Sequence, residues 1–440
     1  MPSLQAAVYP GTFALHSDAE LVENTTTTVF PQIVDLLTKP IKTERKKGAE
    51  AVSTKNIVFT GTLNEVNRYF LTKKWSEGIP VIPPTVKRVE EFLKYTDLPP
   101  DEEIAILPSA NLRATPWNIA VNGVMAGSRP EYMPLLIAMV RTIGDPAFRL
   151  ASWGGSTHSF ILFLCVNGPL ARQLSIDHGQ GLIAYPTNQV IGRTLSLIER
   201  NIAGFRIKET QMGSFGKTQS WVVAEDEEAL FKIGWEPHHV EKGFSRNVST
   251  VSVGSSTVWG QNLIPATSYA KIIMQLMAYG ITYKEGFASG NIGSSRTELI
   301  TPPVAGVLAG GGYTKKSLKE DLIKIARKVT YEWAFSKVQG SFGRVYPSFD
   351  EELAKCLAEP AAEKGKLPPW YPKFPGWEEI QTTPSIQAGN IEIIVCGDTS
   401  RNKAQTLAGG GLMTKEIKLP ANWDAMMEEL GYPPLKSFYL

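Results

Sequence analysis

The chain has 440 residues, of which 43% are hydrophobic and 20% are charged, and its formal net charge is +2. These values are typical of a globular protein and give no overall field that would attract nucleic acid or an anionic membrane. Three cysteines, at positions 165, 356 and 396, are too few for a disulfide framework or a cysteine-rich zinc site. No signal-peptide pattern opens the sequence and no stretch approaches about 18 consecutive apolar residues, so we expect a cytoplasmic protein with neither a nucleic-acid nor a membrane partner.

Residues 1–55 are predicted to form an N-terminal arm and basic linker. Val29–Leu37 has the pattern of a short helix, and residues 39–47 carry several positive charges. This segment is either a solvated linker or an arm that binds another subunit. A homo-oligomer or a partner subunit therefore remains one of the expectations.

The region after the arm predicts a strand at 56–61 and a helix at 64–75. Residues 75–85 contain three prolines and a glycine, which favour an extended course. Thr85 is then expected to cap a helix that runs to Tyr95.

The segment Trp75-Ser-Glu-Gly-Ile-Pro-Val-Ile-Pro-Pro-Thr85 resembles one shared by a group of proteins, some of which are labelled as related to UGSC-type thiol or selenoproteins. Four later stretches are also similar: 126–134, 166–169, 191–195 with Asn201, and 225–228 before 235–244. The resemblance spans roughly residues 56–340. It implies that Glu225, Glu228 and His239 belong to one shared pattern.

Ser128-Arg129-Pro130-Glu131 comes before a predicted helix that has Pro134 in its first turn. The tetrapeptide is either a surface turn or an entry at which Arg129 holds a carboxylate or phosphate near the end of the helix.

A buried strand is predicted at 160–166, where every residue is apolar, and Asn167-Gly-Pro169 ends it. A polar loop containing Asp177-His178 follows, and a helical pattern from Val190 to Ile202 is expected to be capped by Thr187 or Asn188. A strand, a polar loop and a capped helix commonly present polar groups at a pocket. We therefore expect Asn167, Asn188 and Arg193 to bind substrate.

The densest group of titratable residues lies at 225–241, directly after a predicted strand at 221–224. Carboxylates and imidazoles together suit general acid–base chemistry or a divalent metal. Glu225 and His239 are the catalytic candidates, and the metal candidates are His238, His239, Glu225 and Glu241. The alternative is a solvated acidic turn with structural histidines.

Further elements are predicted as a strand at 247–257, a helix from Thr267 or Ser268 to Gly280, and a short helix within 299–312. Ser317 is expected to cap a helix to Val329. Leu-Ala-Gly-Gly-Gly occurs at both 308–312 and 407–411, with different flanking residues.

Residues 341–388 are rich in proline and aromatic residues and are predicted to be a connector or lid. A strand at 391–395 runs into Cys396, which is either a nucleophile or a buried, inert thiol. Met413–Pro420 is predicted to be a further strand.

These patterns predict an α/β fold, with a mixed α+β arrangement as the alternative. The main core would be 56–340, a small C-terminal unit would be 389–440, and the pocket would lie between them. The expected function is an enzyme of lyase or hydrolase type that acts on a small polar or carboxylated molecule, with a divalent metal as a possible cofactor. The alternatives are a thiol-dependent oxidoreductase or transferase using Cys396, and a non-catalytic subunit of a larger assembly.

Overall fold

A computed structural model describes residues 7–11, 16–39, 56–157, 159–214, 216, 219–263, 265–284, 295–329, 382–384 and 391–440. The chain divides into two compact units, Met1–Val58 and Phe59–Leu440. His158, Cys356, the charged residues at 42–47 and almost all of the predicted connector lie outside the described residues. Within these ranges, no helix is both long and apolar enough to cross a membrane.

The first unit contains one helical run. It consists of α1 (Asp18–Asn24), a π-helical turn (Thr25–Val29) and α2 (Phe30–Thr38). Ser17 and Glu20 form a capping box at its beginning. The predicted helix at 29–37 is confirmed. No residue of α1 or α2 is buried.

The second unit is built on a seven-stranded mixed sheet with helices, which confirms the predicted α/β class. The strand order is β4-β3-β5-β10-β6-β9, and β11 also pairs with β5. The strands are β3 (Ile161–Asn167), β4 (Trp221–Ala224), β5 (Thr250–Leu263), β6 (Ser295–Ile300), β9 (Ile391–Val395), β10 (Ala404–Gly409) and β11 (Met413–Glu416).

The sheet consists of two similar halves. In the first half, β3 is parallel to β4 and antiparallel to β5, and in the second half, β6 is parallel to β9 and antiparallel to β10. Each half also contains a fourth strand segment, which continues along the chain from a strand of the other half. Residues 413–416 of β11 pair with 250–253 of β5, while residues 256–263 of β5 pair with β10. The sheet therefore has an internal pseudo-two-fold arrangement, in which β5 and the β10–β11 run cross between the halves.

Glycine is required where β5 and β10 cross. A Cβ atom on Gly409 would lie 2.0 Å from the carbonyl oxygen of Ser255, and the Gly410 N–H donates to that oxygen at 2.8 Å. The sequence Leu407-Ala-Gly-Gly-Gly411 thus lies at a strand crossing. The same five-residue sequence at 308–312 forms the end of helix α13 and the residues after it, so the two occurrences have different structures.

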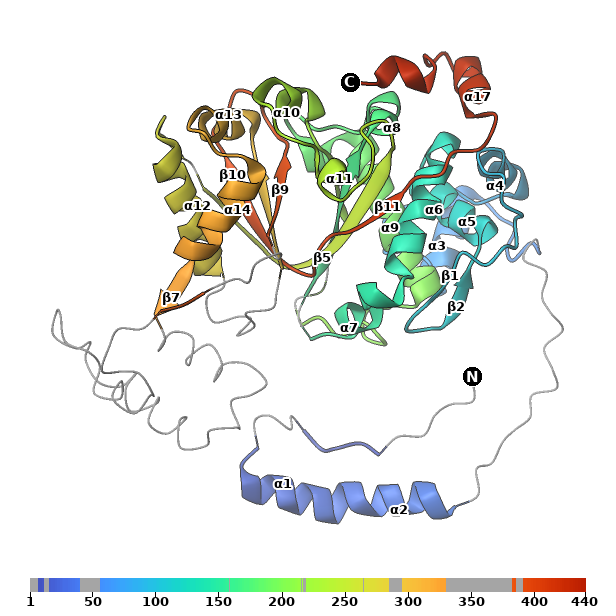
Figure 1. Cartoon of the computed structure of the whole chain (residues 1–440). Helices are drawn as coiled ribbons and strands as arrows, with labels where there is room; N and C mark the ends of the chain where they lie inside the picture. The colour runs from blue at the N-terminus through green and yellow to red at the C-terminus, as the bar shows by residue number, and fades with distance from the viewer. Residues whose placement is uncertain are drawn as a thin grey trace. The chain divides into compact units, whose positions relative to one another are not determined.

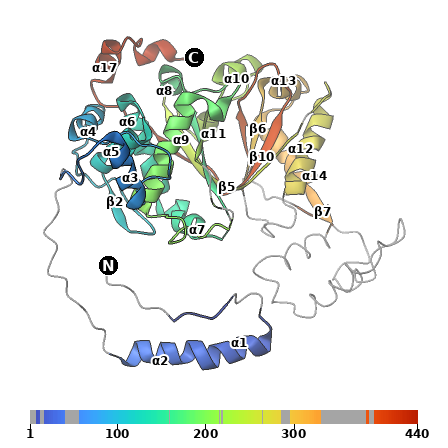
Figure 2. The ribbon, with the colours of Figure 1, turned by 180° about the vertical axis from the view of Figure 1, so that it is seen from behind.

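Helices cover the outer face of each half (Figures 1 and 2). The first half is covered chiefly by α4 (Val86–Leu93), α5 (Pro116–Ala126), α6 (Met133–Ile143) and α9 (Pro186–Ile198), with α3 (Leu63–Thr72) beyond them. The second half is covered by α10 (Glu227–Ile233), α12 (Ala270–Lys284), α13 (Pro302–Gly310) and α14 (Lys315–Ile325). Shorter elements are β1 (Ala105–Leu107), β2 (Leu112–Ala114), α7 (Leu150–Gly154), α8 (Pro169–Gln173), α11 (His238–Glu241), β7 (Arg327–Val329), β8 (Thr382–Pro384) and α17 (Trp423–Glu429).

Alternate residues of the strands pack into different cores, because successive side chains of a strand point to opposite faces. On β3, Leu162 and Leu164 join the core under α5, α6 and α9, whereas Phe163 and Cys165 face inward. The inward residues of the first half pack with those of the second, such as Ile394 of β9. The apolar residues 161–166 of β3 are those expected of a strand that is buried on both faces.

Several elements differ from their prediction. Residues 56–61 form no strand, whereas the short helix predicted within 299–312 is confirmed as α13. The helix α9 begins with Pro186 directly after Tyr185, so neither Thr187 nor Asn188 caps it.

The cap of α14 also differs from its prediction. Thr314 is the residue that caps this helix, and Ser317 is the N3 member of the box.

The segment 389–440 is not a separate layer, since it supplies β9, β10 and β11 to the common sheet. It therefore differs from the predicted small C-terminal unit. The strand β10 was absent from the prediction, although it lies between β5 and β6.

Candidate functional site

The two parallel strand pairs end at the same place. Asp226, the second residue after β4, donates its backbone N–H to the carbonyl of Val395 at the end of β9, at 2.8 Å. The carboxyl ends of β4 and β9 therefore meet, although these strands are at opposite ends of the strand order. In α/β proteins, ligands bind in the crevice outside the carboxyl ends of the strands.

Glu225 lies at this junction and is fully buried. Its Oε1 accepts from Lys315 Nζ at 2.9 Å and from the Val395 N–H at 3.3 Å. Its Oε2 accepts from Asn167 Nδ2 at 2.8 Å and from the His238 N–H at 2.7 Å. Four donors saturate the carboxylate, so Glu225 fastens β3, β9 and two helices together rather than offering a free base.

Glu227 holds a second group of donors. Its Oε1 accepts from the Gly168 N–H at 2.6 Å and from Asn167 Nδ2 at 3.2 Å, and its Oε2 lies 2.7 Å from Arg172 Nη1. Asn167, predicted to bind substrate, is thus occupied by the carboxylates of Glu225 and Glu227.

A network of ion pairs extends from Glu225 across α14. Lys315 Nζ lies 3.4 Å from Glu241, and Lys319 Nζ lies 3.0 Å from Glu241 and 3.6 Å from Glu392. Burial alone would lower the pKa of Lys315, but the carboxylates of Glu225 and Glu241 outweigh burial and raise it. Lys315 therefore stays charged in the interior.

Both histidines of α11 are completely buried. Burial, followed by the nearby lysines, lowers the pKa of His238 well below 6.5, so its ring is neutral. His239 Nε2 lies 3.3 Å from the carbonyl oxygen of Arg246, and its Nδ1 lies 3.7 Å from Glu227. An enclosed ring of this kind reaches no solvent-accessible substrate.

The predicted metal candidates do not form a cation site. Among the described residues, no three His, Cys, Asp or Glu side chains are grouped so that they could hold a metal ion. Glu225 already has four donors, and Lys315 and Lys319 occupy Glu241. The carboxylates of Glu225 and Glu241 are thus neutralised by lysine ammonium groups.

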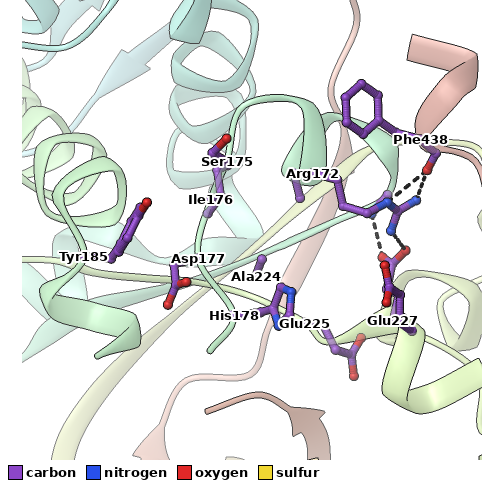
Figure 3. Close-up of a pocket in the computed structure, with 13 residues that line it drawn as sticks. Arg172, Ser175, Ile176, Asp177, His178, Tyr185, Ala224, Glu225, Glu227 and Phe438 are labelled. Carbon is purple, nitrogen blue, oxygen red and sulfur yellow. Dashed lines mark hydrogen bonds and ion pairs between the residues drawn. The ribbon is translucent and has the colours of Figure 1, made fainter. Parts of the chain in front are cut away.

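A cavity of about 390 Å³ opens at the carboxyl ends of β3 and β4. Its polar walls carry carboxylates, an arginine and an imidazole (Figure 3). The lining residues are Gly168, Ala171, Arg172, Ser175, Ile176, Asp177, His178, Tyr185, Ala224, Glu225, Glu227, Glu228 and Phe438.

His178 projects into this cavity, between Asp177 and Tyr185 on one side and Arg172 and Glu227 on the other (Figure 3). Its side chain is 42% exposed, and its Nδ1 lies 3.5 Å from Asp226 Oδ2. Interaction with Asp226 outweighs partial burial and raises the pKa of His178 above 6.5. The imidazole therefore keeps its proton to a higher pH than a free histidine does, and an imidazole is a group that can both accept and donate protons.

The loop that carries His178 is held from both halves of the sheet. The Gly397 N–H, from the loop after β9, donates to the His178 carbonyl at 2.6 Å. Asn188 accepts from the Asp177 N–H at 2.9 Å and donates to the carbonyls of Asp177 and Val222 at 3.0 and 2.9 Å. Asn188, predicted to bind substrate, therefore positions the loop instead.

Arg193, the next predicted binding residue, does not line this cavity. Its Nε donates to Glu77 at 2.7 Å, and its Nη2 donates to the carbonyls of Ile79 and Pro80. It therefore fixes the proline-rich segment 75–85 against α9.

Arg129 also lies away from the cavity. It donates to the hydroxyl groups of Tyr132 and Tyr432, each at 2.7 Å. Both arginines thus use their donors within the protein.

Cys396 does not line the cavity and is 3% exposed. Burial, followed by the neighbouring carboxylates, raises the pKa of its thiol. A buried thiol with a raised pKa forms little of the thiolate that nucleophilic chemistry needs.

The pair of His178 and Asp226 was missed because its members are far apart in the sequence. A usable signal was present, since Asp226 follows the predicted strand at 221–224 and His178 follows the one at 160–166. The carboxyl ends of parallel neighbours meet at one edge of a sheet, which would have placed both residues together.

Comparisons with protein-family models, with curated proteins and with solved structures found no match for this chain.

Proposed function

We propose that this protein is an enzyme that acts on a small polar or carboxylated molecule by acid–base chemistry, with His178 as the catalytic group. The observation that supports this proposal is the half-exposed imidazole of His178 in a 390 Å³ cavity, with its Nδ1 3.5 Å from Asp226. The carboxylate orients the ring and leaves Nε2 for the substrate.

Two reaction types fit a single imidazole of this kind. In an elimination, His178 would remove a proton from the carbon next to an acid group and return one to the leaving hydroxyl or amino group. In a hydrolysis, it would take a proton from water as the water attacks. Both agree with the expectation of a lyase or hydrolase, and neither needs a metal in the ion-pair network.

Proton abstraction is measurable without knowledge of the full reaction. The purified chain is incubated in D₂O with a set of small hydroxy and amino acids, and loss of C–H signals is followed by proton NMR. We expect exchange or turnover with the wild type, and a rate about 10²- to 10⁴-fold lower with His178→Asn. The control is His239→Asn, which changes a buried ring outside the cavity.

Equal rates for the wild type and His178→Asn would contradict the proposal, as would the absence of both exchange and elimination with every compound. Dependence on Cys396 instead, shown by loss of activity in a folded Cys396→Ser variant, would support the thiol alternative. The burial and raised pKa of Cys396 weigh against that outcome.

A second candidate role is assembly with another subunit, and the first unit favours it. The side chains of Val22, Phe30 and Leu37 on α1 and α2 are at least 60% exposed, and no residue of these helices is buried. Exposed apolar side chains along a helix are typical of a surface that binds protein. Light scattering of the full chain and of residues 59–440 tests this role, which predicts a mass per particle above one chain for the first sample alone.

A further inference from the structure

The guanidinium group of Arg172 is fixed at the cavity wall. Its Nη1 lies 2.7 Å from Glu227 Oε2. Glu227 is itself held by the Gly168 N–H at 2.6 Å and by Asn167 at 3.2 Å. Because its partner cannot turn, Arg172 presents its other edge, formed by Nε and Nη2, in one direction (Figure 3).

The edge formed by Nε and Nη2 binds only a neutral acceptor. Nε, at 2.9 Å, and Nη2 both donate to a single main-chain oxygen, the carbonyl of Phe438. A guanidinium edge has two parallel N–H groups and a positive charge, which match the two oxygens of a carboxylate. One neutral oxygen uses this edge less well than an acid group would.

The segment that supplies this carbonyl is a short turn that packs on α8 and, through the partly buried Leu435, on the core of the first half. Leu435–Phe438 forms a short 3-10 turn that contains no buried residue. The Leu435 N–H donates to Asp424 at 2.8 Å, and Gln173 Nε2 donates to the carbonyl of Pro433 at 2.9 Å. A segment with little buried apolar surface opens at low free-energy cost.

The cavity also has groups that would accept hydrogen bonds from a ligand. Asp177 and Glu228 line it together with His178. A ligand with hydroxyl or amino groups would donate to these carboxylates, whereas a plain hydrocarbon acid would leave them facing apolar atoms at a cost.

We propose that Arg172 binds the acid group of a small hydroxy or amino carboxylic acid, which displaces the carbonyl of Phe438 and the turn at 435–438. This inference rests on the proposed function, because the cavity is the same one. The turn would then act as a strap over the cavity, closed without ligand and released when the acid group reaches Arg172.

Sodium glycerate is a suitable probe, because it combines one carboxylate with two hydroxyl groups. Glycerol lacks the acid group, propionate lacks the hydroxyl groups, and sodium chloride at the same concentration controls for ionic strength. We expect glycerate to bind in calorimetry and to speed hydrogen exchange of the amides at 435–440 in the full chain. Propionate should bind more weakly and glycerol should have no effect.

The variant Arg172→Gln should weaken glycerate binding about tenfold or more, because a charge-assisted pair is lost. Arg401→Gln, on the exposed loop after β9, is the matched control and should bind like the wild type. The inference is overturned if glycerate does not bind, or if Arg172→Gln binds it equally well. It is also overturned if glycerol matches glycerate, or if glycerate binds without any change in exchange at 435–440.

Calorimetry and hydrogen exchange need no turnover, so the proposed ligand of Arg172 and the proposed catalysis by His178 can be contradicted independently. Glycerate binding that depends on Arg172, without any reaction that depends on His178, would leave the ligand assignment standing and remove the proposed enzyme. A reaction that depends on His178, with binding that ignores Arg172, would do the reverse.

Discussion

His178 and Asp226 meet because two parallel strands end side by side and their loops turn toward each other. The contact couples the charge of the imidazole to that of the carboxylate. Asp226 is largely buried, which would raise its pKa, but His178 and the Ala229 N–H outweigh burial and lower it. The two groups thus stabilise each other's charged form.

Replacing Asp226 with Asn should lower the pKa of His178, because the interaction with this carboxylate is the largest cause of its raised value. NMR titration of the His178 ring measures the change directly. Glu228→Gln removes a more distant carboxylate and should shift the pKa less. A His178 pKa that is unchanged in Asp226→Asn would contradict the pairing.

His238 makes an opposite contribution to pH dependence. Its pKa is lowered in the folded protein, so below about pH 6.5 the unfolded chain takes up a proton that the folded chain does not. Stability attributable to this ring is therefore present above pH 6.5 and is lost as the pH falls. Urea unfolding of His238→Asn should show a shallower loss of stability between pH 6.5 and 5 than the wild type.

The matched control is His178→Asn, since the pKa of His178 is raised in the folded protein. Stability from its protonation is present below pH 6.5 and is lost as the pH rises through its folded pKa. This variant should therefore lose stability more steeply than the wild type as the pH falls. Parallel curves for both variants and the wild type would refute these assignments.

At the scale of elements, the charged network joins α14 to β4 and β9. Lys315 stands at the first position of α14, and its ammonium group reaches the carboxylate of Glu225, which directly follows β4. The lysine side chain is 4% exposed and that of Glu225 is fully buried. Breaking a buried pair is costly because one charge remains in the interior without its partner.

Lys315→Met should therefore lower the free energy of unfolding by about 3–5 kcal/mol, measured by urea denaturation. Lys316→Met is the matched control, because Lys316 is the next residue on the same helix and is exposed. It should change stability by less than about 0.5 kcal/mol. Equal effects of the two substitutions would show that the buried pair adds nothing specific.

Elements with strong local signals were predictable from the sequence. The all-apolar run at 160–166 gave β3 to within one residue, and Thr85 caps α4 as expected. The strand β10 was missed, because Leu407-Ala-Gly-Gly-Gly411 has low intrinsic preference for a strand and adopts one only through pairing on both sides.

The candidate site was predicted only in part. The region around Glu225 and Asn167 was identified, and Glu225 lines the cavity, yet the polar atoms of both residues are engaged in hydrogen bonds within the protein. Residue type and spacing show which side chains are able to do chemistry. They do not show which of these side chains already form hydrogen bonds within the protein. Glu225 and Cys396 are buried by strands distant in sequence, and no local pattern records that burial.

At the scale of the whole molecule, the crossing of β5 and β10 joins the two halves of the sheet. The crossing depends on close backbone approach, and Gly409 is the residue with least space for a side chain there. Neither half is complete by itself. The end of β5 pairs with β10 in the second half, and β11, which follows β10, pairs with the beginning of β5 in the first half.

Gly409→Ala should destabilise the protein by about 1–3 kcal/mol or more, since the added methyl group would overlap the Ser255 carbonyl. Gly306→Ala, in α13, is the control, because its Cβ would meet no atom within 4 Å. In a helix this change should stabilise by about 0.5–1 kcal/mol. Thermal and urea unfolding measure both, and a neutral Gly409→Ala would show that the crossing adapts.

The position of β10 also bears on how the chain is made. A ribosome releases residues 404–409 long after β5 and β6, yet β10 belongs between them. Until it arrives, both strands present an edge of unpaired N–H and C=O groups, which are templates for aggregation. A chain interrupted before residue 404 would lack β10, so we expect it to leave the facing edges of β5 and β6 unpaired and to aggregate more readily than the full chain.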